Sequence, residues 1–217
     1  MDLPSLLALA WPVMLQGTAY TLLFAVASML FALPLSGAIT LVRVLRLPVA
    51  QRVVALYVSA MRGTPLLVQV FIVYYGLPSI GIEFSPITAG ILALTLNVAA
   101  YMSESLRGSI QAVSQGQWLA GTSLGLTRTQ TLRYVVGPQA LRAAVPSLSN
   151  SLISLIKDTS LVSVIAVTEL MLATKELIST TFQPFPLYLA AAGVYWLLSS
   201  SFEQVQRRME KRLAFPH

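Results

Sequence analysis

The chain has 217 residues, of which 56% are hydrophobic and 10% are charged, and its mean hydropathy is +0.74. A soluble domain carries about 25% charged residues, so this composition predicts an integral membrane protein. The chain has no cysteine and a single histidine, His217, which excludes disulfides, thiolate metal sites and haem ligation by histidine inside the membrane.

The first membrane span is predicted at residues 17–42. This stretch has no charged residue and is long enough to cross about 30 Å of hydrocarbon, and Pro34 is expected to kink it. The preceding segment, 6–16, is too short to span the membrane and is expected to lie at its interface. Three arginines follow the span and mark an aqueous side: Arg43, Arg46 and Arg52.

The second span, 53–76, is predicted to be a broken helix. Proline disfavours the helical conformation in the residue before it, while Thr64 is a suitable N-cap with Pro65 at the first helical position. The piece after the break has twelve residues, or about 18 Å of helix, which is too short to cross the membrane alone. It must therefore be re-entrant, or the preceding segment must complete the span.

Two further apolar runs, 86–106 and 184–202, are predicted to be the third and fifth spans. The third contains Asn97 and carries Glu104 near its end, three residues before Arg107. One interpretation of this carboxylate is an ion pair at the helix end, and the other is a role in transport.

A basic, polar segment at 108–146 separates the third and fourth spans and is predicted to form two short helices. Ser114 and Gln117 have the spacing of a capping box, so a helix is expected to start just after Ser114. Gly125 can adopt the left-handed conformation that ends this helix. The same capping pattern recurs two residues later, which predicts a second helix and a structured element rather than a flexible tether.

The fourth span, 146–173, carries charges at membrane depth. Lys157 and Asp158 lie eleven and twelve residues beyond Pro146, which on a continuous helix places them about 16 to 18 Å into the membrane, near its midplane. An ionised group there costs about 2.5 to 3.5 kcal/mol, so both side chains are expected to face protein or water. Glu169 is expected further outward, at a gate or at an outer contact with a partner.

A polar stripe accompanies these two charges and is formed by Asn150, Ser151, Ser154, Thr159 and Ser160. Both charge signs in one polar stripe would suit a zwitterionic solute, whose carboxylate and ammonium groups each need a counter-group. The structural alternative is that the two charges clamp this helix to the broken second helix through Arg62 or Gln69. The sequence leaves both interpretations open.

Five spans place the two termini on opposite sides of the membrane. The loop at 43–52, the segment at 108–146 and the C-terminus then share one side, which holds eleven of the fourteen Lys and Arg residues. Basic residues concentrate on the cytoplasmic side, so that side is predicted to be the cytoplasm and the N-terminus to face outward. This topology explains the net charge of +6, and nucleic-acid binding is not inferred.

Several short strings of residues, each weak alone, form a specific pattern in this order and at these spacings. They are Gly17-Thr18-Ala19-Tyr20-Thr21-Leu22, Arg62-Gly63-Thr64-Pro65-Leu66-Leu67-Val68-Gln69, Tyr74-Tyr75-Gly76-Leu77-Pro78, Ala100-Tyr101 with Glu104, Gly116-Gln117-Trp118, Ser123-Leu124-Gly125-Leu126, Pro138-Gln139-Ala140-Leu141-Arg142 and Lys157-Asp158-Thr159-Ser160-Leu161. With them, the chain resembles over nearly its whole length the membrane-spanning permease subunits of ATP-binding-cassette importers for polar amino acids.

The resemblance implies an all-α integral membrane protein with the type I importer permease fold, forming one transmembrane domain over residues 1–217. It also implies that the segment at 108–146 is a coupling loop, whose short helices dock into a groove on a cytoplasmic ATPase subunit. The implied coupling residues are Gln117, Trp118, Leu119, Ala120, Gly121, Gly125 and Pro138. The family's loop usually reads Glu-Ala-Ala where this chain has Leu119-Ala120-Gly121, so the family's acidic contact with the ATPase is not expected here.

The substrate pathway is expected to involve Lys157, Asp158, Thr159, Ser160, Asn150, Gln69 and Glu104. Because the chain lacks a P-loop motif, ATP and Mg are expected on partner subunits, with no cofactor, metal or catalytic site in this chain. The implied partners are a second permease, identical or similar, two ATP-binding subunits, an external solute-binding protein and the surrounding lipid. The implied location is the bacterial cytoplasmic (inner) membrane, which the chain crosses several times.

The predicted function is therefore the import of a polar amino acid, driven by ATP hydrolysis on the partner subunits. Two strings, Ser149-Asn150-Ser151 and Gly81-Ile82-Glu83, favour the cystine-type branch, while a basic amino acid and glutamine stay open. The alternative is a passive channel or pore subunit for small polar solutes. A membrane-bound enzyme is disfavoured because the sequence offers no nucleophile, metal cluster or paired carboxylates within a span.

Overall fold

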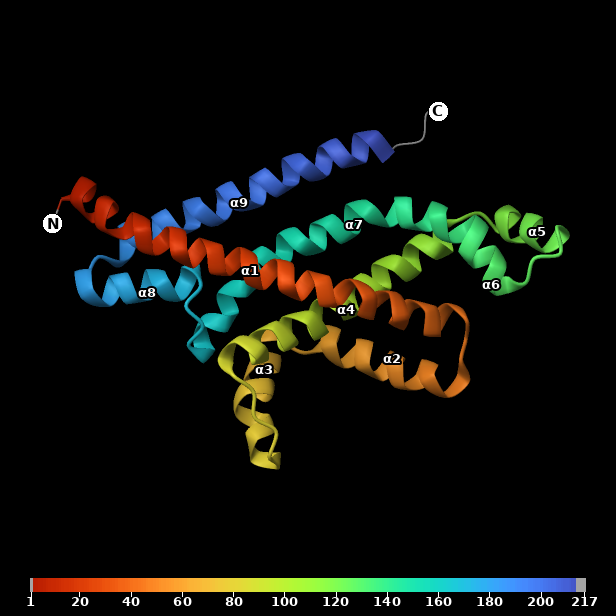
Figure 1. Cartoon of the computed structure of the whole chain (residues 1–217), viewed down its shortest axis with the longest axis horizontal. Helices are drawn as coiled ribbons and strands as arrows, with labels where there is room; N and C mark the ends of the chain where they lie inside the picture. Colours follow the sequence, from red (N-terminus) through yellow and green to blue (C-terminus); the bar gives the residue numbers. More distant parts are fainter. Residues whose placement is uncertain (1, 214–217) are drawn as a thin grey trace.

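The computed structural model describes residues 2–213, and over that range it consists of helices joined by short turns and loops, with no β-strand. Its centre is a bundle in which α1 (Leu3–Val44) packs against α4 (Pro86–Ala112), and α4 packs against α7 (Gly137–Asp158). The last helix, α9 (Pro184–Leu213), lies beside α7 on the outside of this bundle (Figure 1). The single histidine, His217, lies outside the described residues.

The first helix is longer than predicted. The segment at 6–16 was expected to be a separate interfacial piece, but it is the beginning of α1, whose 42 residues correspond to about 63 Å of continuous helix. Leu6, Ala10 and Met14 follow one another at intervals of four residues and are buried against α8 (Leu170–Thr181) and α9. This apolar stripe explains why the helix continues past the expected boundary.

The predicted break in the second span is confirmed. Helix α2 (Pro48–Gly63) ends at Thr64, and the chain turns by 111° before α3 (Leu66–Phe71) begins. The capping prediction is wrong by one residue, because Pro65 is the N-cap of α3 and the Thr64 hydroxyl donates a hydrogen bond back to the Ala60 carbonyl, at 2.8 Å. A π-helical turn (η1, Ile72–Gly76) and a 3-10 turn (η2, Leu77–Ile80) extend α3 away from the bundle (Figure 1).

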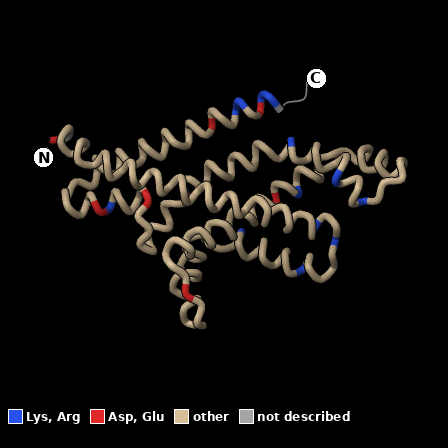
Figure 2. Tube along the Cα trace, viewed as in Figure 1, with Lys and Arg blue, Asp and Glu red and all other residues tan. Residues whose placement is uncertain are grey.

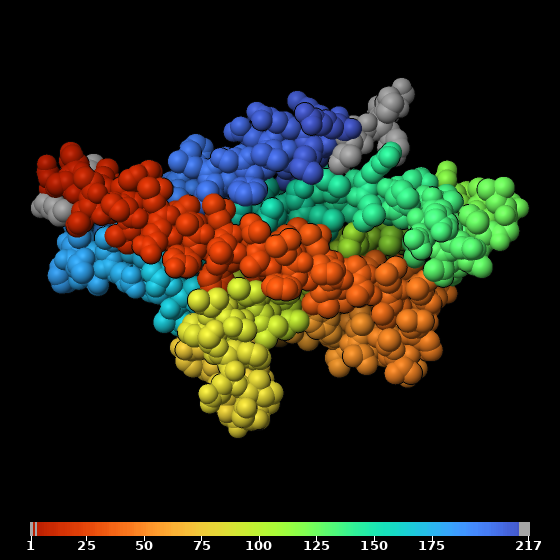
Figure 3. All heavy atoms as spheres, viewed as in Figure 1, coloured from red at the N-terminus to blue at the C-terminus, as the bar shows by residue number. Residues whose placement is uncertain are grey.

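The segment after α4 contains α5 (Gln115–Ser123) and α6 (Arg128–Thr131), and it forms one end of the molecule (Figure 3). The first helix begins where predicted, but the Ser114 side chain makes no capping hydrogen bond. The turn between the helices follows the prediction, because Gly125 adopts the left-handed conformation with φ of 77°. The second capping box forms through Thr127 and Gln130.

The second helix of this segment was predicted to be short, but it is long. After α6 a π-helical turn (η3, Leu132–Val136) leads directly into α7, so the predicted boundary at Pro146 lies inside α7. Helical backbone therefore runs from Arg128 to Asp158. The prediction failed because polar residues before Pro146 suggested a boundary between a short polar helix and the next span. In the structure these polar residues lie on the exposed face of α7, which continues through Pro146.

The fourth span is also discontinuous. Helix α7 ends at Asp158, a 3-10 turn follows (η4, Thr159–Ile165), and Ala166 adopts a left-handed conformation before α8 begins. The fully buried carboxylate of Glu169 then caps α8 by accepting hydrogen bonds from the backbone N–H groups of Met171 and Leu172, both at 2.9 Å. Glu169 also accepts a hydrogen bond from the Tyr195 hydroxyl, at 2.7 Å. It therefore joins α8 to α9 inside the protein instead of standing at an exposed gate.

Three helices of the described chain, α1, α4 and α9, are long and apolar enough to cross a membrane, and the bent pair of α2 and α3 would make a fourth span. The count of five spans and the outward N-terminus stay predictions. Many of the Lys and Arg residues lie along the backbone at the end that holds the α1–α2 turn and the α5–α6 segment (Figure 2). This is the charge asymmetry on which the predicted orientation rests.

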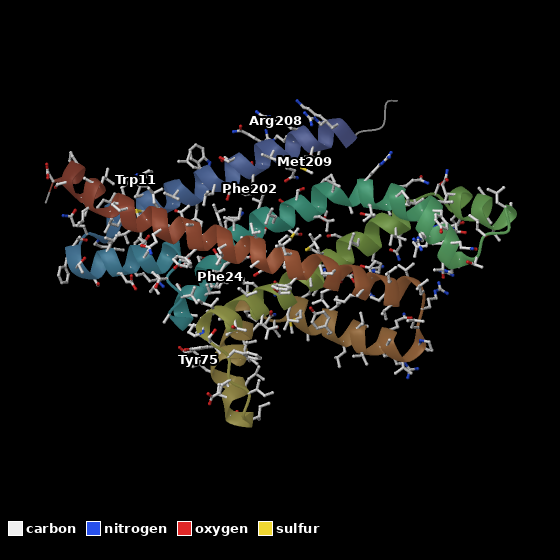
Figure 4. All side chains as sticks on the ribbon, in the orientation of Figure 1. Trp11, Phe24, Tyr75, Phe202, Arg208 and Met209 are labelled. Atoms are coloured by element: carbon white, nitrogen blue, oxygen red, sulfur yellow. The ribbon has the colours of Figure 1, made fainter. Side chains whose placement is uncertain are left out.

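The largest apolar core lies where α1, α4 and η4 meet. Phe24, Leu94 and Val162 are fully buried there, and Figure 4 shows Phe24 pointing into the bundle from α1. Trp11, at the other end of the same helix, is 58% exposed. The core fixes α4 against α1 and against the end of α7. Helices α4 and α7 carry many of the polar side chains described next.

Candidate functional site

A polar cavity of about 550 Å³ opens between the break of the second helix, α4 and α7. Three ionisable side chains line it, each from a different element: Arg62 from the end of α2, Glu104 from α4 and Asp158 from the end of α7. The cavity therefore contains both charge signs, as the sequence predicted. The cation is a different residue from the one expected.

Glu104 lies at the positively charged end of the cavity and contacts three arginines. Its carboxylate pairs with Arg107 at 2.7 Å, with Arg62 at 3.7 Å, and with Arg43. The predicted ion pair with Arg107 is confirmed, but Arg43 and Arg62 were not expected in it. Their contribution could not be read from the sequence because they lie on α1 and α2, about 40 to 60 residues from Glu104.

Arg62 is the most accessible of these three arginines. Its side chain is 45% exposed, against 21% for Arg43 and 30% for Arg107. The guanidinium lies over the ring of Tyr101, 5.5 Å from its centroid, which orients it by a cation–π contact. One carboxylate shared by three guanidinium groups leaves an excess of positive charge, so Arg62 can bind a carboxylate that enters the cavity.

Gln69 was predicted in the substrate pathway, but it supports the break instead. Its side chain is buried, and the amide nitrogen donates hydrogen bonds to the Met61 carbonyl and to the Thr64 hydroxyl, both at 2.9 Å. Its amide oxygen accepts a hydrogen bond from Asn97 of α4, also at 2.9 Å. Gln69 thereby satisfies backbone groups that the break leaves open and ties the break to α4, while Asn97 itself lines the cavity.

The polar stripe on α7 faces the cavity through residues spaced four apart. Asn150, Ser154 and Asp158 line it, whereas Lys157 is exposed outside it. Adjacent residues on a helix project about 100° apart, so Lys157 can point away from the cavity that Asp158 lines. Lys157 is not part of this lining, in which Arg62 is the cationic side chain. The role of Lys157 in the pathway stays a prediction.

The residues after Asp158 close the helix rather than line the cavity. Thr159 is fully buried, and its hydroxyl donates to the Ile156 carbonyl at 2.8 Å. Ser160 lies in η4 and is not part of the lining. Among residues 2–213, Asp158 makes no salt bridge. Its carboxylate is therefore the part of the lining best placed to accept an ammonium group.

The α5–α6 segment presents apolar side chains to solvent. Leu119 is 67% exposed and Leu124 is 79% exposed, while Trp118 packs with Arg128, whose guanidinium lies 5.7 Å from the ring centroid. Gln117 and Ala120 are also exposed on α5, and Pro138 is exposed in the first turn of α7. Exposed leucines at the tip of a rigid element are typical of a surface that another protein covers.

Gly121 holds the two helices of this segment together. A methyl group at this position would lie 2.5 Å from Cγ2 and 2.7 Å from Oγ1 of Thr131, so α5 approaches α6 more closely than an alanine would permit. The family's loop usually has alanine at this position. Glycine, which has no side chain, leaves the space that the Thr131 side chain occupies. A hydrogen bond from Gln139 to Gln117, at 3.2 Å, also joins α7 to α5.

The chain is similar in sequence to known membrane transport proteins. Residues 35–215 match the family model described as the binding-protein-dependent transport system inner membrane component. The chain is 41% identical over 204 residues to the L-cystine transport system permease protein TcyB of Bacillus subtilis (strain 168), covering 94% of this chain and 87% of that relative. It is 34% identical over 206 residues to the glutamine transport system permease protein GlnP of Escherichia coli (strain K12), covering 94% of both chains.

Solved structures give the same result. A crystal structure of an amino acid ABC transporter with histidines superposes with a TM-score of 0.92 at 32% identity, covering 98% of this chain and 99% of that chain. An inward-facing structure of the methionine ABC transporter MetNI superposes with a TM-score of 0.79, but at 17% identity, so it supports the fold alone. The whole described chain is thus covered by a known helical arrangement.

Proposed function

This chain belongs to the family of binding-protein-dependent transport system inner membrane components, and we propose that it forms the path by which an ATP-driven importer carries a polar amino acid. Members of this family are transport subunits of the inner membrane, and the ATPase activity belongs to partner subunits. Partnership with ATP-binding subunits and a solute-binding protein follows from the family.

The observation that carries the substrate class is the presence of both charge signs in the lining of one cavity. The Arg62 side chain is 45% exposed, and Asp158, which also lines the cavity, makes no salt bridge within residues 2–213. A carboxylate of the substrate would bind Arg62 and an ammonium group Asp158. A cavity of about 550 Å³ is within the usual range for a small-molecule site.

The importer is favoured over a passive channel. The relatives and the superposed transporter are ABC systems, and the chain carries a capped, rigid segment with exposed leucines that a channel would not need. We propose that α5 and the turn at Gly125 dock into a groove on the ATPase subunit, which binds ATP and Mg. Because Leu119 is exposed and apolar, that groove should be apolar where it meets α5.

The assembly that we propose has two permeases, identical or similar, and two ATPase subunits. The described chain has three helices, or four spans if the bent pair is counted as one, that are long and apolar enough to cross a membrane, and a second copy would supply further helices to enclose the path. Cystine is the favoured substrate because TcyB, at 41% identity, is named as a cystine permease, whereas GlnP, a glutamine permease, is 34% identical.

The substrate assignment is tested by binding to the permease–ATPase complex without the solute-binding protein, so that selection by the external partner does not mask the cavity. Cystine should bind, and cystamine, which is cystine without its carboxylates, should bind at least tenfold more weakly. In Arg62→Gln the difference between these ligands should largely disappear. Equal binding of cystine and cystamine to the unmodified complex would refute the role of Arg62, and preferred binding of glutamine would reassign the substrate.

A further inference from the structure

A second cavity, of about 670 Å³, lies between the α1–α2 turn, the end of α4 and the α5–α6 segment. Four arginines line it, Arg43, Arg46, Arg107 and Arg128, together with Trp118, and none of its lining residues is acidic. Figure 2 shows the positions of basic residues along the backbone at this end of the molecule. The cavity is separate from the polar cavity described above, and the two linings share no residue.

The protein neutralises only part of this charge. Arg43 and Arg107 both pair with Glu104, which they share with Arg62. Arg46 and Arg128 make no salt bridge among residues 2–213, and Arg128 stacks on Trp118. The cavity therefore holds four guanidinium groups against one shared carboxylate, which is the arrangement of an anion site.

The backbone at Arg46 is an independent sign that this residue is held in place. Its φ of 56° lies in the left-handed region, which costs a residue other than glycine about 1–2 kcal/mol. Glycine or asparagine would relieve this cost in a turn of this kind. The conformation directs the chain from α1 into α2 while Arg46 lines the cavity.

An apolar stripe begins directly after this arginine. Val49, Val53 and Leu56 recur along one side of α2 and are 77%, 65% and 73% exposed. A free inorganic anion would use the arginines but leave this stripe bare. A molecule with an anionic phosphate head and long apolar chains would use both surfaces.

We propose that this cavity binds the phosphate headgroup of an anionic phospholipid, with its acyl chains lying along the exposed side of α2. Basic pockets between helices at the cytoplasmic side of a membrane are suited to such headgroups. Trp118 and Arg128 lie on the α5–α6 segment, Arg43 and Arg46 lie at the α1–α2 turn, and Arg107 lies on α4. A bound lipid would therefore join the segment proposed to contact the ATPase to the membrane-embedded bundle. The proposed lipid site does not depend on the transport function, and its test requires no transport assay.

The test measures which lipids stay bound to the purified full chain by native mass spectrometry, after extraction from membranes containing phosphatidylcholine and phosphatidylglycerol. The unmodified protein should retain phosphatidylglycerol in preference to phosphatidylcholine. Each basic residue near an anionic headgroup contributes about a fivefold change in binding, so Arg46→Gln should reduce retention about fivefold. Arg46→Lys should retain phosphatidylglycerol as the unmodified protein does. Arg208→Gln, which removes an exposed arginine of α9 outside the lining, should also behave as the unmodified protein.

Three outcomes would overturn the proposal. Equal retention of the two lipids would show no anion selectivity. Displacement of phosphatidylglycerol by inorganic phosphate at physiological concentration would show that the cavity takes a free anion instead. Unchanged lipid retention in Arg46→Gln, combined with weaker assembly with the ATPase subunits, would assign the arginines to an acidic surface of that partner.

Discussion

Replacement of Gly121 by alanine tests the tightest contact in the proposed docking element. The added methyl group would lie 2.5 Å from Cγ2 of Thr131, whereas carbon atoms in contact prefer about 3.5 to 4.0 Å. Helix α5 must therefore move by about 1 Å, and overpacking of this kind costs about 1–3 kcal/mol. The population in which α5 is open should rise about 5- to 150-fold.

Hydrogen exchange measured by mass spectrometry reports this population directly. The informative amides are those of Leu124 and Leu126, which donate to the carbonyls of Ala120 and Gly121 and close the end of α5. They should exchange faster in Gly121→Ala by the same 5- to 150-fold factor. ATP-driven uptake should fall in parallel, because a loosened α5 transmits movement poorly to the bundle.

Two further variants separate this explanation from a general effect of alanine. Gly116→Ala changes the same helix where the nearest atom, Ser114 Oγ, is 3.8 Å away, so it should leave exchange unchanged or slower. Thr131→Ala added to Gly121→Ala removes the two closest atoms and leaves Cβ at 3.1 Å, so it should restore much of the protection. Normal exchange in Gly121→Ala, or no recovery in the double variant, would refute the proposed packing.

Three other substitutions have defined outcomes. Gly125→Val places a β-branched residue at a φ of 77°, costing about 1–2 kcal/mol, and should raise the ATP hydrolysed per amino acid transported; an unchanged ratio would contradict the role of this turn in coupling. Asp158→Asn should impair uptake but not assembly with the ATPase, whereas Lys157→Gln, outside the cavity, should leave uptake normal; the reverse pattern would restore Lys157 to the pathway. Glu169→Ala removes a helix cap and the carboxylate that accepts from the Tyr195 hydroxyl, so it should destabilise the purified protein by about 2–4 kcal/mol in thermal unfolding, and an unchanged midpoint would contradict this.

Features that depend on neighbouring residues in the chain could be predicted. The break at Thr64 and Pro65 follows from the restriction that proline imposes on the residue before it, and the turn at Gly125 from the conformational freedom of glycine. The second capping box also formed. In each case a few adjacent residues determine the backbone conformation, whatever packs against them.

Features that depend on contacts between distant segments could not be predicted. The length of α1 is set by α8 and α9, which cover its first turns. The end of α7 at Asp158 is not marked by proline or glycine, and the depth counted from Pro146 did not show that Lys157 lies outside the cavity. Asp158 lines the cavity, but the cationic side chain there, Arg62, comes from another helix. The roles of these residues in the pathway stay predictions.

The position of the predicted coupling segment and its two helices was readable from sequence, but its packing was not. The departure at Gly121 gave no signal of the close approach of Thr131, which lies ten residues further along the chain. A pair of residues that match in size becomes visible only when the turn at Gly125 has brought the two helices together.

The central claim is that a motor outside this chain drives movement of solute through it. The most direct measurement is accumulation of labelled cystine in proteoliposomes that contain this chain with its ATPase subunits, and with the solute-binding protein on the side opposite the ATPase. Cystine should accumulate against its gradient only when ATP is supplied to the side bearing the ATPase. Equal flux through the permease alone, without ATPase subunits or nucleotide, would contradict the account and identify a passive pore.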